Sequence, residues 1–466
     1  MKKFSLLFML FGALMFFGVG CDDDTNNNAD NNQTGDELCD NQADDDGDGD
    51  VDCDDADCAS DAACAANNVN NSNNVNNQTS DTRNVDLMFV IDTSLSMEDY
   101  QILLGANLPN LVQTLAGATG GMPNLHVGFV TPDLGSSPYN IPSCERPGGD
   151  AGRYQKGVNN SCANPVGQTY LVDVAPAGCT VEKTDAEGEP TVCTAHDCVQ
   201  ANCDVAAFTD LEGVASEPEG LTLAVDENGC PRCRNYDGEP LDNVLACMSS
   251  LGTDGCGFEQ PLEAMKLAIT DWSGDNAWFL REDAYLAVVI LTDEDDCSVK
   301  QAEFFNPQGD INSTLGLLSS FRCTEFGVVC DQEWERIMPE GSLTYTGCEP
   351  RPNGDPRAML YPVTNYVEIL QQLKAPGMLG ALVIAGPAGV TVTVGLDNNQ
   401  NPILTASCGL PAEGAMPAVR LEGFTELVGE GANSFAEFSS ICESDYSQAL
   451  ESLATWLTER MESAAQ

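Results

Sequence analysis

Blocks of apolar and polar positions alternate along most of the chain, from about residue 82 onward. Short, almost wholly apolar runs rich in β-branched residues are typical of buried strands. We predict strands at 85–91, 125–131, 285–292, 379–384 and 390–394. Segments with apolar residues at helical spacing lie between them. We predict helices at 100–116 (interrupted by Pro109), 258–272, 365–373, 418–428 and 446–461. This order predicts an α/β fold with a doubly wound, mostly parallel sheet flanked by helices.

Two long stretches, at about 133–256 and 296–360, lack this alternation. They contain ten and four cysteines, respectively, and many Gly and Pro residues. A structureless loop of such length is uncommon inside a compact domain. Disulfides can stabilise such a segment without a large core, each by about 2–4 kcal/mol. We therefore expect one domain at 82–466 that carries two disulfide-rich insertions.

The part of the chain before residue 82 has a different composition. Residues 22–81 contain eighteen Asp and Glu residues and no Lys or Arg, and many of the other residues are Asn. Such a composition cannot bury a core. We expect a polar tether at 22–38, a small acidic unit bounded by cysteines at 39–64, and an Asn-rich linker at 65–81.

The formal net charge of the chain is −54. A charge of this sign argues against nucleic acid and anionic membrane surfaces as partners, because both are polyanions. Divalent cations and basic proteins are the natural partners of such a surface. The charge is explained equally well by solubility with cation binding outside the cell and by recognition of a charged partner.

Residues 1–21 are typical of an export signal. Lys2 and Lys3 precede an apolar run over 4–17 that is too short for a confident transmembrane helix. The segment ends in Gly-Val-Gly before Cys21 and resembles a bacterial lipobox, in which the cysteine becomes the lipidated first residue. Lipoboxes usually carry Leu where this chain has Gly18. The alternative is cleavage by an ordinary signal peptidase.

The number of cysteines also indicates that the protein is exported. Without Cys21, the 21 cysteines become an even number, as a disulfide framework in an oxidising compartment requires. The resemblance at Cys21 implies contact with a membrane through a lipid anchor. We expect a protein of the bacterial cell envelope, at the outer membrane or cell surface rather than the inner membrane.

Oxygen-bearing side chains follow two of the predicted strands. Asp92, Ser94 and Ser96 come directly after the strand at 85–91, and Asp293 ends the strand at 285–292. Ligands of open α/β sheets bind at the carboxyl ends of the strands. Hard oxygen donors suit a small divalent cation. These residues therefore predict a cation site at that edge of the sheet.

The pattern resembles the metal-ion-dependent adhesion site of von Willebrand factor type A (VWA) domains, which have a Rossmann-like sheet. The resemblance implies that Ser94 and Ser96 bind the ion directly, while Asp92 and Asp293 supply charge and hold ordered water. The expected ion is Mg²⁺, followed by Mn²⁺ or Ca²⁺. With few fixed negative charges around it, the ion can accept an acidic group from a partner. The alternative is that both aspartates only cap loops or helix N-termini.

The chain departs from the VWA pattern at the third element of the site. VWA sites normally add a Thr ahead of the helix that precedes the second Asp strand. The usual spacing falls near Cys256 in this chain, and Thr253 lies three residues too early. Glu259 could substitute, although its charge would neutralise the ion further. Thr253, Glu259 or water could therefore complete the coordination shell.

A second acidic motif lies in the unit at 39–64. Read as a twelve-residue calcium loop, it has alternate acids, with Gly49 at the sharp turn. It is similar to the loops of thrombospondin type 3 repeats, and four cysteines would hold it in place. The expected Ca²⁺ ligands are Asp44, Asp46, Asp48, Asp50, Asp52 and Asp55. The alternative is a solvated acidic tether.

Zinc binding and catalysis have weaker support. Cys193, Cys198 and Cys203 with His196, and the pair Cys230 and Cys233, have spacings that zinc sites use, but an exported chain favours disulfides. The chain has two histidines and no nucleophile elbow, phosphate loop or dinucleotide fingerprint. We expect that it is not an enzyme.

Together these features resemble the VWA-containing lipoproteins of Gram-negative bacteria. They predict an exported, lipid-anchored envelope protein whose VWA-like domain binds a divalent cation and mediates adhesion to a protein or matrix ligand. The alternative is a structural surface protein that associates through its acidic, calcium-loaded surface. In that case the VWA-like fold is a scaffold.

Overall fold

The computed structural model describes residues 83–464 apart from short gaps. The gaps are 178–179, 185–186, 189, 198–201, 204–207, 210–214, 217–219, 227, 272, 339–340 and 410–413. The export signal with Cys21, the polar tether, the acidic calcium-loop unit and the Asn-rich linker all lie outside the described residues.

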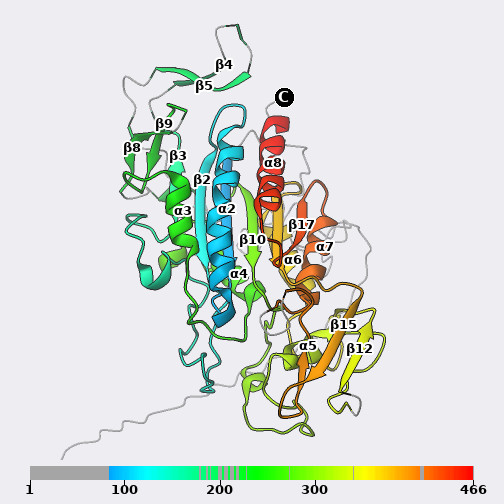
Figure 1. Cartoon of the computed structure of the whole chain (residues 1–466). Coiled ribbons are helices and arrows are strands. Elements are labelled where there is room, and N and C mark those ends of the chain that lie inside the picture. Colours follow the sequence, from blue (N-terminus) through cyan, green and yellow to red (C-terminus); the bar gives the residue numbers. More distant parts are fainter. Residues whose placement is uncertain are drawn as a thin grey trace, which may run out of the picture. The chain divides into compact units, whose positions relative to one another are not determined.

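A mostly parallel sheet forms the centre of the domain (Figure 1). Within the described residues it has eight strands in the order β17-β14-β10-β1-β2-β3-β9-β8. These are Phe435–Ser440, Leu379–Ala385, Tyr285–Leu291, Asn84–Ile91, Asn124–Val130, Leu171–Val174, Pro231–Arg234 and Thr222–Val225. The first five are parallel to one another, and β3, β9 and β8 are added antiparallel. The predicted α/β class and mostly parallel sheet are confirmed.

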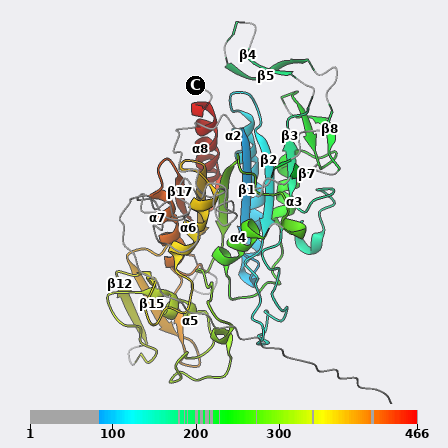
Figure 2. The same cartoon turned by 180° about the vertical axis from the view of Figure 1, so that it is seen from behind.

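Helices cover both faces of this sheet (Figures 1 and 2). On one face lie α2 (Glu98–Ala116), α3 (Leu241–Ser249) and α8 (Ser447–Ala464). On the other lie α4 (Pro261–Thr270), α6 (Val363–Leu373) and α7 (Val419–Gly429). Successive residues of a strand point to opposite faces, so Phe89 packs in the first core and Met88 and Val90 in the second. Because both faces are covered, β10 and β14 carry no polar side chain other than Tyr285, and from Leu87 onward β1 is apolar as well.

The predicted interruption at Pro109 is wrong. α2 runs without a break through this residue. A proline inside a helix removes one backbone hydrogen bond and crowds the preceding turn. Here Leu104, Leu108 and Leu111 on the same helix are buried against the sheet, α3 and α8. Each buried leucine stabilises the fold by about 1.5–3 kcal/mol, which offsets the local penalty.

Two other elements differ from the sequence prediction. β17 was not predicted, although it pairs with β14 along its whole length at the edge of the sheet. The strand predicted at 390–394 exists as β15 (Thr391–Leu396), but it belongs to a separate sheet with β12 (Ser342–Thr346) and β16 (Pro402–Leu404). It therefore forms no part of the central sheet.

The stretch at 133–256 contributes to the central sheet as well as to loops. Its strands β3, β9 and β8 extend the sheet beyond β2, and its helix α3 packs on α2. Two further hairpins pair β4 (Thr180–Thr184) with β5 (Pro190–Asp197), and β6 (Phe208–Thr209) with β7 (Ala215–Ser216). The sequence pattern predicted little regular structure here because these strands are short and carry charged residues.

The stretch at 296–360 contains α5 (Phe321–Gly327), β11 (Val328–Val329), β12 and β13 (Glu349–Pro350). Both views place α5, β12 and β15 beyond one end of the central sheet. The chain passes into this region directly after β10. It returns to the region in β15, which directly follows β14. The region therefore lies at the carboxyl edge of the parallel strands.

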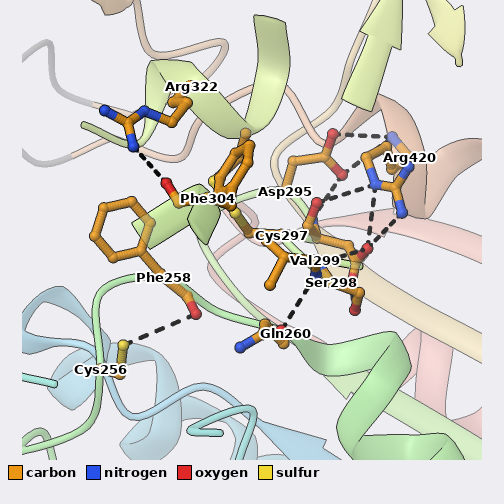
Figure 3. Close-up of a disulfide and its surroundings, with 12 residues drawn as sticks. Cys256, Phe258, Gln260, Asp295, Cys297, Ser298, Val299, Phe304, Arg322 and Arg420 are labelled. Atoms are coloured by element: carbon orange, nitrogen blue, oxygen red, sulfur yellow. Dashed lines mark hydrogen bonds and ion pairs between the residues drawn. A yellow bond between two sulfur atoms is a disulfide. The ribbon is translucent and has the colours of Figure 1, made fainter. Parts of the chain in front are cut away.

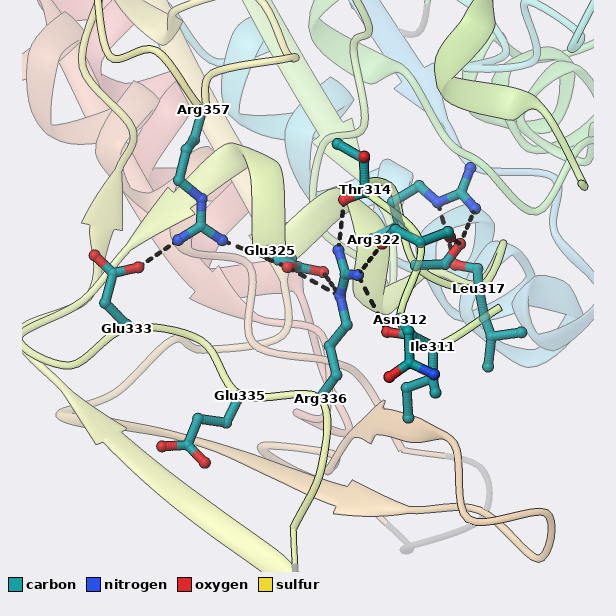
Figure 4. A network of polar contacts seen from close by, with 12 residues as sticks. Ile311, Asn312, Thr314, Leu317, Arg322, Glu325, Glu333, Glu335, Arg336 and Arg357 are labelled. Atoms are coloured by element: carbon teal, nitrogen blue, oxygen red, sulfur yellow. Dashed lines mark hydrogen bonds and ion pairs between the residues drawn. The ribbon is translucent and has the colours of Figure 1, made fainter. Parts of the chain in front are cut away.

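Arginine side chains hold the irregular part of this region together (Figure 4). Arg322 donates to the backbone carbonyls of Gly316 at 2.8 Å and Leu317 at 3.1 Å. Arg336 donates to the carbonyl of Thr314 at 2.9 Å and pairs with Glu325 at 2.9 Å. Backbone carbonyls that no strand or helix satisfies need such donors when they are buried.

Disulfides form within each of the two stretches, as the even cysteine count predicts, and one more lies near the end of the chain. In the described part of the chain the bonds are Cys144–Cys256, Cys162–Cys247, Cys203–Cys233, Cys297–Cys323, Cys330–Cys348 and Cys408–Cys442. Cys230 is also disulfide-bonded. Zinc ligation by Cys203, Cys230 and Cys233 is thereby excluded in this oxidised form. The side chains of Cys193, His196 and Cys198 lie outside the described residues.

The bond Cys144–Cys256 encloses the bond Cys162–Cys247. With the inner bond intact, the outer bond closes only the short segments 144–162 and 247–256. Loop-closure entropy for a loop of this size corresponds to about 3 kcal/mol. We expect Cys144→Ala combined with Cys256→Ala to lower the free energy of unfolding by about that amount in urea denaturation followed by circular dichroism. A change below about 1 kcal/mol would contradict this nested arrangement.

Candidate metal site

The order of strands creates a switch point between β1 and β10. Six strands, β3-β2-β1-β10-β14-β17, follow the order 3-2-1-4-5-6 along the chain. The connections from β1 and from β10 therefore leave toward opposite sides of the sheet, and a crevice forms at the carboxyl ends of these two strands. Asp92 directly follows β1, and Asp293 follows β10 after one residue. The fold thus places both predicted aspartates at the usual ligand position of such a sheet.

Asp92 is held rigidly in the first turn after β1. Its backbone N–H continues the strand ladder by donating to the carbonyl of Leu291 at 2.9 Å. Its Oδ1 accepts the N–H of Ser94 at 2.7 Å, and its Oδ2 accepts the hydroxyl of Thr292 at 2.8 Å. Asp92 therefore does cap its loop, as the alternative interpretation predicts, while its carboxylate stays at the crevice.

The two serine hydroxyls lie next to each other on this loop. The Oγ atoms of Ser94 and Ser96 are 3.4 Å apart. Ser94 is buried and Ser96 is exposed. Both hydroxyls, and Asp92, lie close enough to the Asp293 carboxyl group to lower its pKa. The structure therefore brings together Asp92, Ser94, Ser96 and Asp293.

Glu259 joins this group from the segment that precedes α4. The side chains of Asp293 and Glu259 are almost wholly buried, with 4% and 1% exposed. Asp293 Oδ1 and Glu259 Oε1 have no hydrogen-bond partner among the described residues. Buried carboxylate oxygens are rarely left without a partner in proteins. Two such atoms beside the same loop indicate that a donor or a cation belongs there.

Burial raises the pKa values of four carboxyl groups at the crevice, and the charges of neighbouring acids add to this shift in three of them. Burial, and next the charge of Asp293, raise the pKa of Asp92 to about 7. Burial, followed by Asp293 and Asp92, raises the pKa of Glu294 to about 8. Burial and then Asp92 raise the pKa of Glu259 well above its usual value, and burial raises the pKa of Asp293. The four groups can be fully ionised only when positive charge is nearby.

That positive charge does not come from the described residues, since none of their Lys, Arg or His side chains pairs with these four acids. At the other end of β1, in contrast, a buried acid does have a basic partner. There, buried Asp86 pairs with the guanidinium of Arg281 at 2.8 Å. An unpaired buried carboxylate is strongly unfavourable. The cluster must therefore hold protons or a cation.

The raised pKa of Asp92 predicts how stability depends on pH when no metal is bound. A carboxyl group with a higher pKa in the folded than in the unfolded protein binds protons more tightly when folded. The stability that the protonated Asp92 carboxyl group gives the folded protein is complete below the pKa of an unfolded aspartate, about 4. This stability is lost as the pH rises through the pKa of Asp92 in the folded protein, about 7. In EDTA, we expect the free energy of unfolding to fall across this window, and to fall less in Asp92→Asn. Denaturant titrations at several pH values check this, and identical pH profiles would contradict it.

Asp295 and Asp296, which follow the cluster in sequence, have a different role (Figure 3). Asp295 accepts the backbone N–H groups of Arg420 and Leu421 at the start of α7, at 2.9–3.2 Å. Asp296 accepts the N–H of Leu262 at the start of α4 and pairs with the Arg420 guanidinium at 2.8 Å. Helix capping therefore explains Asp295 and Asp296, but no such bond involves Asp293 among the described residues.

Gln101 is a residue of this site that the sequence analysis missed. Its buried amide donates to the backbone carbonyls of Asp92 at 2.7 Å and Gly252 at 2.8 Å. Its Oε1 accepts the N–H groups of Leu251 and Gly252. It thus ties the loop at 251–255 to the Asp92 loop. A polar residue on the buried side of the first turns of α2 is the signal that could have shown it.

Thr253 lies between two attachment points of this loop. Gln101 holds Gly252, and the N–H of Gly255 donates to the carbonyl of Thr93 at 2.8 Å. A Cβ atom on Gly255 would lie 2.1 Å from Thr93 Oγ1, so only glycine allows this approach. Thr253 is half-buried and lines a cavity on the Thr93 side of the loop. Glu259 interacts electrostatically with Asp92 and Asp293. Which of Thr253, Glu259 or water would complete the shell of an ion stays a prediction.

The remaining candidates are placed as follows. The calcium-loop residues Asp44 to Asp55 and the lipidation site Cys21 lie outside the described residues. His126 is buried inside β2, and its Nδ1 lies 2.8 Å from the Phe279 carbonyl, as expected for a structural histidine. Over the described ranges, no three His, Cys, Asp or Glu side chains are arranged to hold a metal by themselves. A metal at this crevice would need the serine hydroxyls.

The fold and the crevice define a class: an α/β protein with a mostly parallel sheet and a buried group of carboxyl and hydroxyl oxygens at its switch point. Comparisons with protein-family models, with curated proteins and with solved structures found no match. Among the helices of the described part of the chain, none is long and apolar enough to cross a membrane. The disulfides are compatible with a location outside the cell.

Proposed function

We propose that the protein is an exported, lipid-anchored component of the bacterial cell envelope. Its VWA-like domain binds a divalent cation at the crevice between β1 and β10 and uses that edge to recognise a protein or matrix ligand. The observation that carries the proposal is the pair of unpartnered, buried oxygens of Asp293 and Glu259 beside the Asp92 loop. A cation would supply the positive charge that the described protein groups do not.

The donor set favours a hard cation. Carboxyl and hydroxyl oxygens suit Mg²⁺, Mn²⁺ and Ca²⁺, and nitrogen and sulfur donors, which zinc prefers, do not contribute. By the VWA resemblance, Ser94 and Ser96 would bind the ion directly, with Asp92 and Asp293 around it. Glu259 would close the shell or hold a water molecule there. Mg²⁺ is the expected ion because two hydroxyls and water leave room for its octahedral shell.

Recognition is supported by the exposed tip of the Asp92 loop. Leu95 stands between the two serines and is 86% exposed. An isolated exposed leucine needs no explanation, but this one adjoins the proposed ion. A partner that offers a carboxylate to the ion would cover Leu95 and gain its burial. The adhesion role, the anchor at Cys21 and a Ca²⁺ ion at the acidic unit belong to the same proposal.

Equilibrium dialysis of the full chain against Mn²⁺ tests the cation site. The acidic unit before residue 82 would take up ions as well, so the informative quantity is the difference between variants. We expect Asp293→Ala and the pair Ser94→Ala with Ser96→Ala each to bind one Mn²⁺ fewer than the wild type. Glu368→Gln, an exposed acid on α6, is the matched control. Equal Mn²⁺ uptake by all four proteins would overturn the proposal.

A further inference from the structure

A polar cavity of about 430 Å³ adjoins the Asp92 loop at Thr93. Its walls come from Thr93, from the segment after β2 that includes Glu145 and Arg146, and from the loop at 251–255. The bond Cys144–Cys256 joins two of these walls, because Glu145 follows one cysteine and Gly255 precedes the other. This disulfide therefore holds these two walls of the cavity close to each other.

The cavity and the proposed cation site share one stretch of backbone. Thr93 lines the cavity, and its two neighbours in sequence, Asp92 and Ser94, belong to the cation site. Neighbouring Cα atoms are about 3.8 Å apart. Gln101 and Gly255 fix the cavity loop to the Asp92 loop. A ligand bound to the ion can therefore reach this cavity within the length of a few residues.

The charges in the cavity favour a cationic group. Arg146 is neutralised by Asp133 at 2.9 Å and Asp150 at 2.7 Å. Glu145 and Asp254 also line the cavity, and both are exposed. Neither forms an ion pair within the described residues. These two carboxylates leave the cavity with an uncompensated negative charge.

The size and the apolar part of the cavity favour a side chain over a second metal ion. An ion with oxygen ligands at about 2.0–2.6 Å would contact only a small part of this space. Val158 and Leu251 provide an apolar wall. Lysine and arginine lay their aliphatic stems on such a surface and keep the charged end near acids. The net charge of −54 also favours a basic partner.

We propose that this cavity is a subsite for a lysine or arginine side chain of the partner. The ligand is then a polypeptide segment with an acidic residue that reaches the cation and, close by, a basic residue that enters the cavity. This inference rests on the proposed function of the cation site. The aliphatic stem packs on Val158 and Leu251, and the charged end pairs with Glu145 and Asp254.

Calorimetric titration of the full chain in Mn²⁺ tests this with three peptides: acetyl-Asp-Gly-Lys-amide, its norleucine analogue and its Asn analogue. Norleucine keeps the stem and lacks the charge. We expect the Lys peptide to bind about tenfold more tightly than the norleucine peptide, and the Asn analogue to bind more weakly than the Lys peptide. Glu145→Gln combined with Asp254→Asn should remove the lysine preference. Glu349→Gln combined with Glu368→Gln, two exposed acids elsewhere, should keep it.

The outcomes separate the two proposals. Equal affinity for the Lys and norleucine peptides, with binding that still requires Mn²⁺, overturns the cavity assignment and leaves the cation site standing. In EDTA, acetyl-lysine-amide and acetyl-norleucine-amide are compared by NMR shifts of the wild type and the Glu145→Gln, Asp254→Asn variant. A lysine preference that the wild type shows in EDTA and the double variant lacks supports the cavity as a subsite for a basic side chain, even if Mn²⁺ does not bind. A preference unaffected by the double substitution overturns it.

Discussion

In EDTA, Asp293→Asn should be more stable than the wild type, although replacing a buried residue usually lowers stability. Asp293 adds to the charge repulsion that raises the pKa values of Asp92, Glu259 and Glu294. Asparagine keeps nearly the same shape and removes one charge. Each unit of pKa shift relieved corresponds to about 1.4 kcal/mol. We expect a gain of about 1 kcal/mol in the free energy of unfolding at neutral pH, from denaturant titration.

Added Mn²⁺ should reverse this order. An ion that binds only the folded state stabilises it by about 2.7 kcal/mol at a hundred times its dissociation constant. We expect the wild type to gain this amount and Asp293→Asn to gain little, because its site has lost a charge. The control Glu368→Gln should follow the wild type in both conditions. If the variant is less stable than the wild type in EDTA, or gains as much from Mn²⁺, the carboxyl cluster is not a cation site.

Arg420→Met should lower the free energy of unfolding by about 3–5 kcal/mol. The guanidinium is 1% exposed and pairs with Asp296 at 2.8 Å, while donating to the carbonyl of Tyr361 at 2.8 Å. Its loss leaves the buried charge of Asp296 without an oppositely charged partner. The same carboxylate caps α4 through the N–H of Leu262. The substitution should therefore loosen the end of α4 that carries Glu259 toward the crevice.

A double variant distinguishes lost charge pairing from lost packing. Arg420→Met combined with Asp296→Asn removes both charges and keeps one acceptor for the N–H of Leu262. We expect it to recover at least about half of the lost stability, since replacing a buried ion pair as a whole is often close to neutral. Thermal or denaturant unfolding of the three proteins measures this. A double variant as unstable as Arg420→Met would show that the loss comes from packing alone.

The sequence predicted four of the five parallel strands, because these four are buried on both faces, whereas the edge strand β17 is only partly buried. β10 is a continuous apolar run, and the predicted strand at 85–91 is interrupted only by Asp86, so both stand out whatever their neighbours are. β3 was missed because Asp173 lies within it, and a charge inside a short segment indicates a loop. The structure explains this residue by its pairs with Arg232 at 2.6 Å and Arg234 at 2.8 Å. Those partners are far away in sequence and cannot be inferred from local pattern.

Some residues of the candidate site can also be predicted from the local sequence, whereas others depend on contacts that are distant in sequence. Asp92, Ser94, Ser96 and Asp293 could be selected from sequence, because each directly follows a strand whose end is predictable. Glu259 could be named only as a substitute, since its burial depends on how the segment before α4 packs. Gln101 was missed because its role depends on a loop 150 residues away in sequence. The cavity beside Thr93 depends on a disulfide whose pairing the sequence does not specify.

β1 has a mechanical consequence if the protein is anchored through Cys21. The anchored segment would enter the domain at one end of β1, and the Asp92 loop leaves at the other. A partner pulling on that loop would therefore stretch β1 along its own length. β1 is paired in parallel with β2 over Asn84–Val90 and with β10 over Val85–Ile91. Because the force would enter and leave β1 at its two ends, the already extended backbone of this strand would carry the load. Its pairing on both sides would hold it in place, so the Asp92 loop would keep its shape under tension.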